Sequence, residues 1–417
     1  MVVCAGVKPS RRALLVLSFS YLVWAFLAAH IGASRSALYD YTDHWSHYGR
    51  AALFLAHGFD VYRFPATRYC RAPSPEAARK LPVEGGCGWC VADKVSTDDR
   101  PLCINWTWLR NGYPPGLSVY SLPEVLLLQH TSLSLRAINL FTILKYLLAA
   151  HILLWFLFKQ VFAPPERQRG GAASGEAWLR YGLFALFYLE ILKWTLSGFY
   201  DPVAVCAIFV GVWQLRRRRG VAAILALSVA VFLHYRALWY CPLFAFAGWT
   251  AVRQREWQAG RWRVVAELAA SALVLGLSLY AFVLLYPGLK DFLTNNSVML
   301  KDLSLTKPAA WNLVVPLVPV LLYFAWSRQW TLLSCVAWQL FVVTRTYQIQ
   351  GWHILFLLPM LGLARLEGKR GSLLAVGVVY LTEALVIFYN DAPIFHYAVP
   401  IPGGHITNLM QLWRAWW

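Results

Sequence analysis

The stretch from Tyr39 to Arg63, YDYTDHWSHYGRAALFLAHGFDVYR, decides how the rest of this chain is interpreted. It follows closely on an apolar run over residues 13–33. It holds three carboxylates, Asp40, Asp43 and Asp60, in a chain that has few acids. Carboxylates beside a membrane helix are costly to keep near hydrocarbon, and they are usually retained for a task. The stretch therefore predicts a functional segment that a hydrophobic scaffold holds at a membrane surface.

The composition excludes an ordinary soluble domain. Of the 417 residues, 59% are hydrophobic and only 14% are charged. Apolar runs of membrane-spanning length recur along the chain, so we expect an all-α polytopic membrane protein with about ten to thirteen transmembrane helices. We expect these helices to form a single membrane domain over residues 1–417. The apolar segments after 13–33 are 115–130, 136–162, 178–198, 202–215, 220–235, 237–252, 264–286, 311–327, 330–344, 352–364 and 372–389.

The formal net charge of +18 is carried by short basic clusters between the apolar runs. The clearest clusters are Arg216–Arg219, Arg253–Arg263 and Arg365–Arg370. This pattern is typical of the positive-inside rule and does not indicate nucleic-acid binding. It predicts that these clusters face the cytoplasm, and Arg11 and Arg12 predict a cytoplasmic N-terminus.

One stretch conflicts with this alternation. If 115–130 and 136–162 both cross the membrane, Arg167 and the cluster Arg216–Arg219 fall on the outer side. Either one segment is re-entrant or interfacial, or a half-length helix is hidden near 178–198.

A long polar loop, residues 35–113, is expected on the outer face with short helices of its own. It contains Cys70, Cys87, Cys90 and Cys103. An outer compartment is usually oxidising, which favours two disulfides. A Cys4 zinc site and a redox-active CxxC in GCGWC are the alternatives, and the sequence leaves the pairing open.

Two acids in this loop are candidates for chemistry. Asp40 and Asp43 would share one face of a helix, or converge from a loop on a hydroxyl or a metal ion. Either residue could instead cap a helix that begins at His44, because aspartate is a favoured N-cap. Tyr113 comes before two prolines that suit a loop-to-helix junction, and it could line a pocket.

Polar groups recur where later apolar runs reach the expected outer face. Asp201, in GFYDP, could face the same cavity as Asp43 or cap the next helix, and Lys193 precedes it. His234 and Arg236 end an otherwise apolar helix. An arginine at such a position can bind a phosphate with two parallel hydrogen bonds, or extend its side chain to the interface as an anchor.

Arg345 and His353 lie in another expected outer loop, TRTYQIQGWH. Together with Arg236 they could hold a lipid-linked phosphate. Duty as a membrane anchor would explain each of them singly.

The ordered set of these motifs resembles the GT-C membrane glycosyltransferases, particularly the polyprenol-phosphate-mannose-dependent mannosyltransferases. The matching elements are Asp43 to Ala52 with Gly58, Asp60 and Tyr62, then Tyr113-Pro114-Pro115, Gly198 to Asp201, His234 to Arg236, and Gln350 to His353 with Pro359. Phe199 stands where that family has glutamine, and the cysteine-rich segment 70–103 has no counterpart there.

The resemblance implies an inverting enzyme that moves mannose or another sugar from a polyprenyl-phosphate donor to a lipid, glycan or protein acceptor. Asp43 would be the general base, and Asp40 and Asp201 would orient the acceptor. The leaving phosphate would be held by Arg236, Arg345 and His353, with Lys193 behind them. No metal is required, although a divalent cation is conceivable. The expected location is a bacterial inner membrane, with the active site facing the periplasm or exterior.

Two other functions fit the composition. A lipid or solute transporter or flippase would carry charges near the bilayer midplane, often in repeated halves. A structural membrane protein would bind a partner through its cysteine-rich loop. The chain shows no repeated halves, and its polar groups gather at one face, which favours the enzyme.

Overall fold

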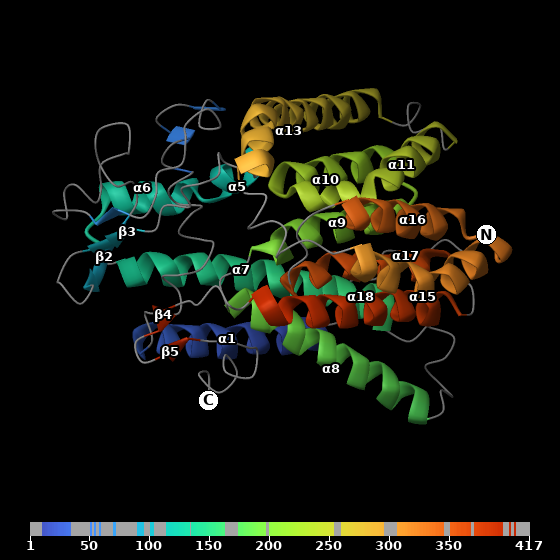
Figure 1. Cartoon of the computed structure of the whole chain (residues 1–417), viewed down its shortest axis with the longest axis horizontal. Coiled ribbons are helices and arrows are strands. Elements are labelled where there is room, and N and C mark those ends of the chain that lie inside the picture. The colour runs from blue at the N-terminus through green and yellow to red at the C-terminus, as the bar shows by residue number, and fades with distance from the viewer. Residues whose placement is uncertain are drawn as a thin grey trace.

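The structure is a computed structural model. It describes residues 11–34, 51, 54–55, 58–59, 70–71, 90–95, 101–103, 114–133, 135–162, 174–196, 200–253, 260–295, 307–345, 351–367, 371–394, 400–401 and 404–405. These residues are overwhelmingly helical, which confirms the all-α prediction. Most of the helices run roughly along the long axis of the molecule (Figure 1).

After the long segment that follows α1, most of the helices of the bundle are joined by short connections. In chain order they are α1 (Arg11–Ser34), α5 (Pro115–Tyr120), α6 (Leu122–His130), α7 (Leu135–Leu157) with the π-helix η3 (Phe158–Phe162), α8 (Ser174–Leu196), α9 (Asp201–Arg216), α10 (Gly220–Leu233), the 3₁₀-helix η5 (Tyr235–Tyr240), α11 (Cys241–Arg253), α13 (Arg261–Asn295), α15 (Lys307–Trp326), α16 (Trp330–Arg345), the 3₁₀-helix η6 (Gly351–Leu357), α17 (Leu358–Glu367) and α18 (Ser372–Ile394).

In the part of the chain that the structure describes, five short strands interrupt the helical pattern. β1 (Cys70–Arg71), β3 (Pro101–Cys103) and β2 (Cys90–Val95) form an antiparallel sheet in that spatial order. β4 (Pro400–Ile401) pairs with β5 (Gly404–His405). The sequence predicted short helices in the loop 35–113, and this small sheet is a feature that the prediction did not include.

The helices explain the conflict around residues 115–130. This segment is divided at Ser121 into α5 and α6, of 6 and 9 residues. Together the two helices cover residues 115–130, about 24 Å, which is shorter than the roughly 30 Å hydrocarbon thickness. Gly116 of α5 lies directly against Phe232 near the end of α10, where a β-carbon would collide with the backbone. A segment of this length agrees with the alternative that it is re-entrant or interfacial.

The position of the C-terminal end of α7 and η3 agrees with this alternative. Arg216 donates a hydrogen bond from Nη1 to the carbonyl oxygen of Gln160, at 3.3 Å. The end of α7 thus lies beside Arg216–Arg219, at the end of the bundle that the charge pattern requires.

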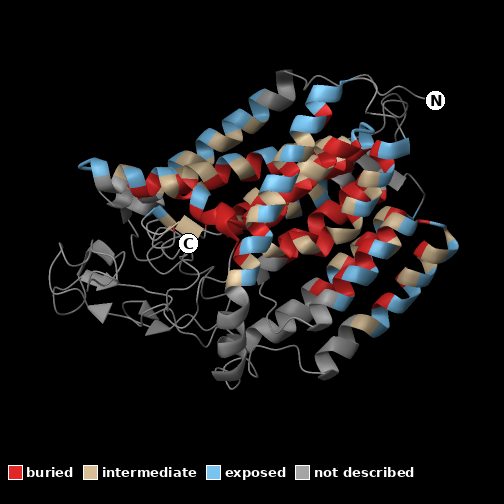
Figure 2. Cartoon of the chain, turned by 90° about the horizontal axis from the view of Figure 1, so that it is seen from above, coloured by how far each residue is buried: buried red, intermediate tan, exposed pale blue. Residues whose placement is uncertain are grey.

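The bundle also exposes a large apolar surface. Among the described residues, Leu140–Phe162 and Arg261–Leu284 are long and apolar enough to cross a membrane. Shorter apolar helices are Leu15–His30, Gly220–Leu233, Val314–Trp326, Trp330–Phe341, Ile354–Ala364 and Ser372–Glu383. In the window on α13, only 17% of the residues are buried, and the outer helices carry many exposed apolar side chains (Figure 2). Such a surface needs an apolar covering, which indicates membrane association.

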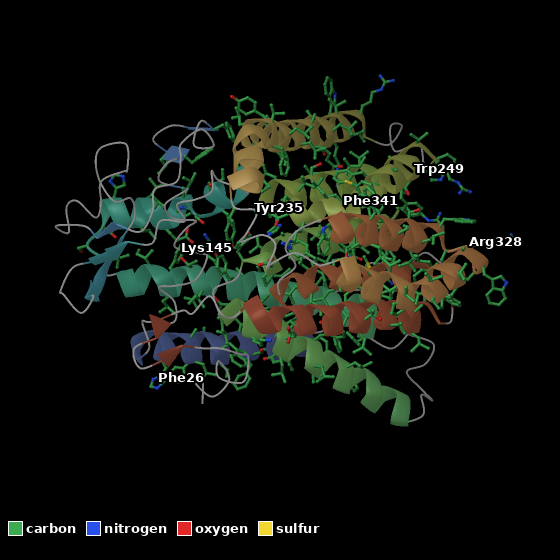
Figure 3. The ribbon with its side chains drawn as sticks, in the orientation of Figure 1. Phe26, Lys145, Tyr235, Trp249, Arg328 and Phe341 are labelled. Atoms are coloured by element: carbon green, nitrogen blue, oxygen red, sulfur yellow. The ribbon has the colours of Figure 1, made fainter. Side chains whose placement is uncertain are left out.

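The bundle has two chemically different ends. Val221, Ala251 and Val264 pack together, so the helix ends that carry Arg216–Arg219, Arg253 and Arg261–Arg263 are neighbours. Trp249 and Arg328 lie at this same end (Figure 3). We call it the basic end. Asp201 and His234 stand at the opposite ends of α9 and α10.

A polar network ties the first helix into the bundle. Trp24 donates to the Tyr188 hydroxyl at 2.5 Å, which in turn contacts the Ser20 hydroxyl at 2.6 Å. Ser20 contacts His151 Nε2 at 3.0 Å, and His151 Nδ1 lies 2.8 Å from the Leu147 carbonyl. Because a carbonyl only accepts, Nδ1 carries the proton and Ser20 donates to Nε2. The chain of donors fixes the relative positions of α1, α7 and α8.

Candidate functional site

The candidate site is built where three elements meet. Asp201 opens α9, and the proline that follows it suits a first helical turn. His234 has an extended backbone that ends α10, with φ −151° and ψ 128°. Arg236 follows in η5. The turn between α10 and η5 thus brings His234 and Arg236 to the start of α9.

His234 has a defined tautomer and a defined neighbour. Its Nδ1 accepts a hydrogen bond from the backbone N–H of Arg236 at 3.0 Å. In the neutral ring the proton is therefore on Nε2, and Nε2 lies 3.7 Å from Asp201 Oδ1. That separation is longer than a hydrogen bond, so these two atoms are close neighbours that are not hydrogen-bonded to each other.

All three side chains are withdrawn from solvent. The exposed fractions of Asp201, His234 and Arg236 are 1%, 2% and 3%. Burial lowers the pKa of His234 well below its ordinary value, and the Arg236 guanidinium lowers it further, so the imidazole is neutral at pH 7. Burying an acid, an imidazole and a guanidinium among apolar helices is costly, and such groups are candidates for function.

Aromatic rings surround the cluster. The rings of Tyr200, Tyr235 and Phe356 lie 5.5, 4.8 and 4.9 Å from the His234 ring, measured between centroids. The Arg236 guanidinium lies 5.2 Å from the Tyr235 ring centre and 5.8 Å from that of Trp239. Aromatic packing holds a planar guanidinium in one orientation, which suits recognition of an anion with two parallel hydrogen bonds.

Two of these residues also have an ordinary structural role. The His234 side chain caps η5, and Asp201 lies in the first turn of α9, where an acid is favourable. Neither role explains the buried guanidinium of Arg236.

A second charged group adjoins this cluster, and the sequence analysis missed it. Lys145 of α7 lies 2.5 Å from Glu124 Oε1 of α6 and 2.6 Å from the Tyr120 carbonyl oxygen. Tyr146 and Tyr200 are buried together, with Tyr120 packed against them. Since Tyr200 also stacks on His234, Tyr200 lies between the two polar groups. Figure 3 shows Lys145 and Tyr235 away from the basic end.

A signal for this second group was present in the sequence. Glu124 stands in the apolar run LPEVLLL, and Lys145 stands in FTILKYLL. An isolated charge within an apolar run marks a site that needs a partner.

The other predicted residues have different outcomes. Lys193 interacts within its own helix: its ammonium lies 3.5 Å from Glu190 and over the Trp194 ring. Arg345 ends α16 and His353 lies in η6, but their side chains are outside the described residues. η6 also carries Phe356, which contacts His234. Asp40, Asp43 and Tyr113 lie outside the described residues.

Parts of the segment after Asp43 are described. Ala51 is fully buried, and the Phe59 ring lies 6.0 Å from that of Tyr280 on α13. α5 packs on both α10 and α13. In the described part of this segment, Phe59 therefore contacts α13.

The strand register limits which of the predicted disulfide cysteines can be joined to each other. Cys103 in the central strand is directly opposite Cys70 on one side and Cys90 on the other. Cys70 and Cys90 are then two strands apart, roughly 10 Å, which exceeds the span of a disulfide. Peptide mapping without reduction should find Cys103 joined to Cys70 or to Cys90, with Cys87 in the second bond. A Cys70–Cys90 bond would contradict this register.

No cluster of metal-ligating side chains is found among the residues with described side chains. Comparisons with protein-family models, with curated proteins and with solved structures find no match for this chain. The function must therefore be argued from the site itself.

Proposed function

We propose that this protein is a polytopic membrane glycosyltransferase of the GT-C kind, which transfers a sugar from a polyprenyl-phosphate donor to an acceptor. The observation that carries the proposal is the buried cluster of Asp201, His234 and Arg236 at the end of the bundle remote from the basic end. The basic end faces the cytoplasm by the positive-inside rule, so the cluster faces the periplasm or exterior.

The roles follow from the chemistry of the groups. The leaving group is a lipid phosphate, whose negative charge grows as the glycosidic bond breaks. Arg236, oriented by two aromatic rings, supplies hydrogen bonds and positive charge to that phosphate. Arg345 and His353 assist from the α16–η6 connection.

The acceptor needs a general base. Asp43 takes the proton of the acceptor hydroxyl as it attacks the anomeric carbon, with inversion. Its carboxylate also stabilises the oxocarbenium-like transition state. Asp201 and Asp40 orient the acceptor, and neutral His234, with its proton on Nε2, lies beside Asp201. A polyprenyl-phosphate donor carries a single phosphate, so no metal ion is needed to neutralise the charge of a diphosphate leaving group.

The proposal is tested by incubating the purified protein with radiolabelled polyprenyl-phosphate sugars and a bacterial membrane extract as acceptor. We expect label in an acceptor product from at least one of the mannosyl, glucosyl, galactosyl or arabinosyl donors. The matching nucleotide sugars should give no product. Transfer from nucleotide sugars alone would contradict the proposed donor class.

A further inference from the structure

The pair of Glu124 and Lys145 is incompletely satisfied. Lys145 has three N–H donors, of which two meet Glu124 Oε1 and the Tyr120 carbonyl oxygen. Thr142 adds a long hydrogen bond to the same oxygen, Oε1, at 3.4 Å. Within the described part of the chain, Glu124 Oε2 is buried and has no hydrogen-bond partner. The Lys145 ammonium also lies 4.0 Å from the centre of the Tyr120 ring, so Glu124 Oε2 is the atom of the pair that is left without a partner.

Leaving a buried carboxylate oxygen without a donor costs free energy comparable with a lost charged hydrogen bond. Glu124 is only 1% exposed, whereas the Lys145 side chain is 18% exposed. A ligand can therefore reach the pair from the lysine side.

The chemistry of the pair selects the ligand. A phosphate only accepts hydrogen bonds, and the adjacent carboxylate would repel it. A hydroxyl group both accepts and donates, so one hydroxyl, or two neighbouring ones, can accept from Lys145 and donate to Glu124. From this geometry we propose that Glu124 and Lys145 form a subsite for hydroxyl groups of the transferred sugar.

The position of the pair agrees with this role, which rests on the proposed function. Tyr120 and Tyr146 stack with 6.2 Å between their centroids, and Tyr200 joins this cluster to His234. In a polyprenyl-phosphate sugar the phosphate is bonded directly to the sugar. The proposed subsite requires that the sugar of a donor whose phosphate is held by Arg236 lies toward α6 and α7.

The competing explanation is that the pair only ties α6 to α7. The two explanations separate in a double variant, E124M/K145M. Replacing both members of a buried ion pair with apolar side chains of similar volume often leaves the fold intact, whereas removing one member leaves a buried charge unpaired. The matched control is R263M/E267M, which removes an exposed 2.8 Å pair on α13 at the basic end.

The experiment measures binding, so it does not depend on transfer. The probes are ten-carbon prenyl phosphates carrying mannose, glucose, galactose or arabinose, and the same prenyl phosphate without a sugar. Kd values are measured for wild type, the double variant and the control, each checked by thermal unfolding. We expect at least one sugar to improve wild-type and control binding about tenfold or more. That gain should vanish in E124M/K145M, while binding of the sugar-free probe stays within about twofold.

The outcomes separate the two proposals. If wild type binds the prenyl phosphate but no sugar improves binding, or if the double variant keeps the gain, the subsite is wrong and the proposed function stands. If wild type binds none of the probes, both are wrong.

Discussion

Replacing Arg236 with glutamine should lower the rate of sugar transfer by about 10²–10³-fold. The guanidinium is buried and lies near two aromatic rings, so we expect it to meet the leaving phosphate without reorganisation. Glutamine keeps a hydrogen-bond donor but has no positive charge to stabilise the departing phosphate. Initial rates with saturating donor give the loss in kcat.

Two further variants make this prediction specific. R236K keeps the charge but loses the planar pair of donors, so its rate should lie between those of wild type and R236Q. R263Q, at an exposed position on α13, should keep the wild-type rate. A folded R236Q protein with a normal rate would remove Arg236 from the phosphate site.

The Asp43→Asn variant should lose about 10²–10⁴-fold in transfer rate. Asparagine has nearly the same shape but cannot take a proton at neutral pH, so the acceptor hydroxyl stays protonated as it attacks. The loss should appear in kcat, because a general base acts in the transition state and contributes little to ground-state binding. Single-turnover rates with a preformed donor complex measure it.

Asp40→Asn is the matched control for this prediction, since it removes a carboxylate three residues away. Its rate should fall by less than about tenfold, as expected for a residue that only orients the acceptor. Equal activity of Asp43→Asn and wild type would place the base elsewhere, with Asp40 and Asp201 as the next candidates.

The helices of this fold could be predicted because apolar length is a local property. Each apolar segment from 115–130 onward contains helix in the structure. The crossing or interfacial nature of 115–130 could not be predicted, because it depends on a break at Ser121 and on contact of Gly116 with Phe232. That contact joins segments more than a hundred residues apart, which composition does not encode.

Part of the candidate site could also be predicted, because it depends on local sequence. Asp201, His234 and Arg236 were found because they stand at the ends of apolar runs, and helix ends on the same face have a fair chance of meeting. Glu124 and Lys145 are each visible in the sequence as an isolated charge, but their pairing depends on how α6 packs on α7.

The small sheet was beyond sequence reasoning. β1, β2 and β3 have 2, 6 and 3 residues, too few for a clear alternating pattern, and they lie far apart in a polar loop. The cysteines pointed to this region, but only the register shows that Cys103 faces both Cys70 and Cys90.

Glycosyl transfer can be separated from transport in sealed proteoliposomes. They are supplied with a radiolabelled polyprenyl-phosphate sugar and a membrane-extract acceptor. Product chromatography and protection of the label inside the vesicles are read from the same sample. We predict that wild type joins the label covalently to acceptor, and that Asp43→Asn and R236Q do so far more slowly. Label that crosses into the vesicle lumen with no covalent product would contradict the account and identify a transporter.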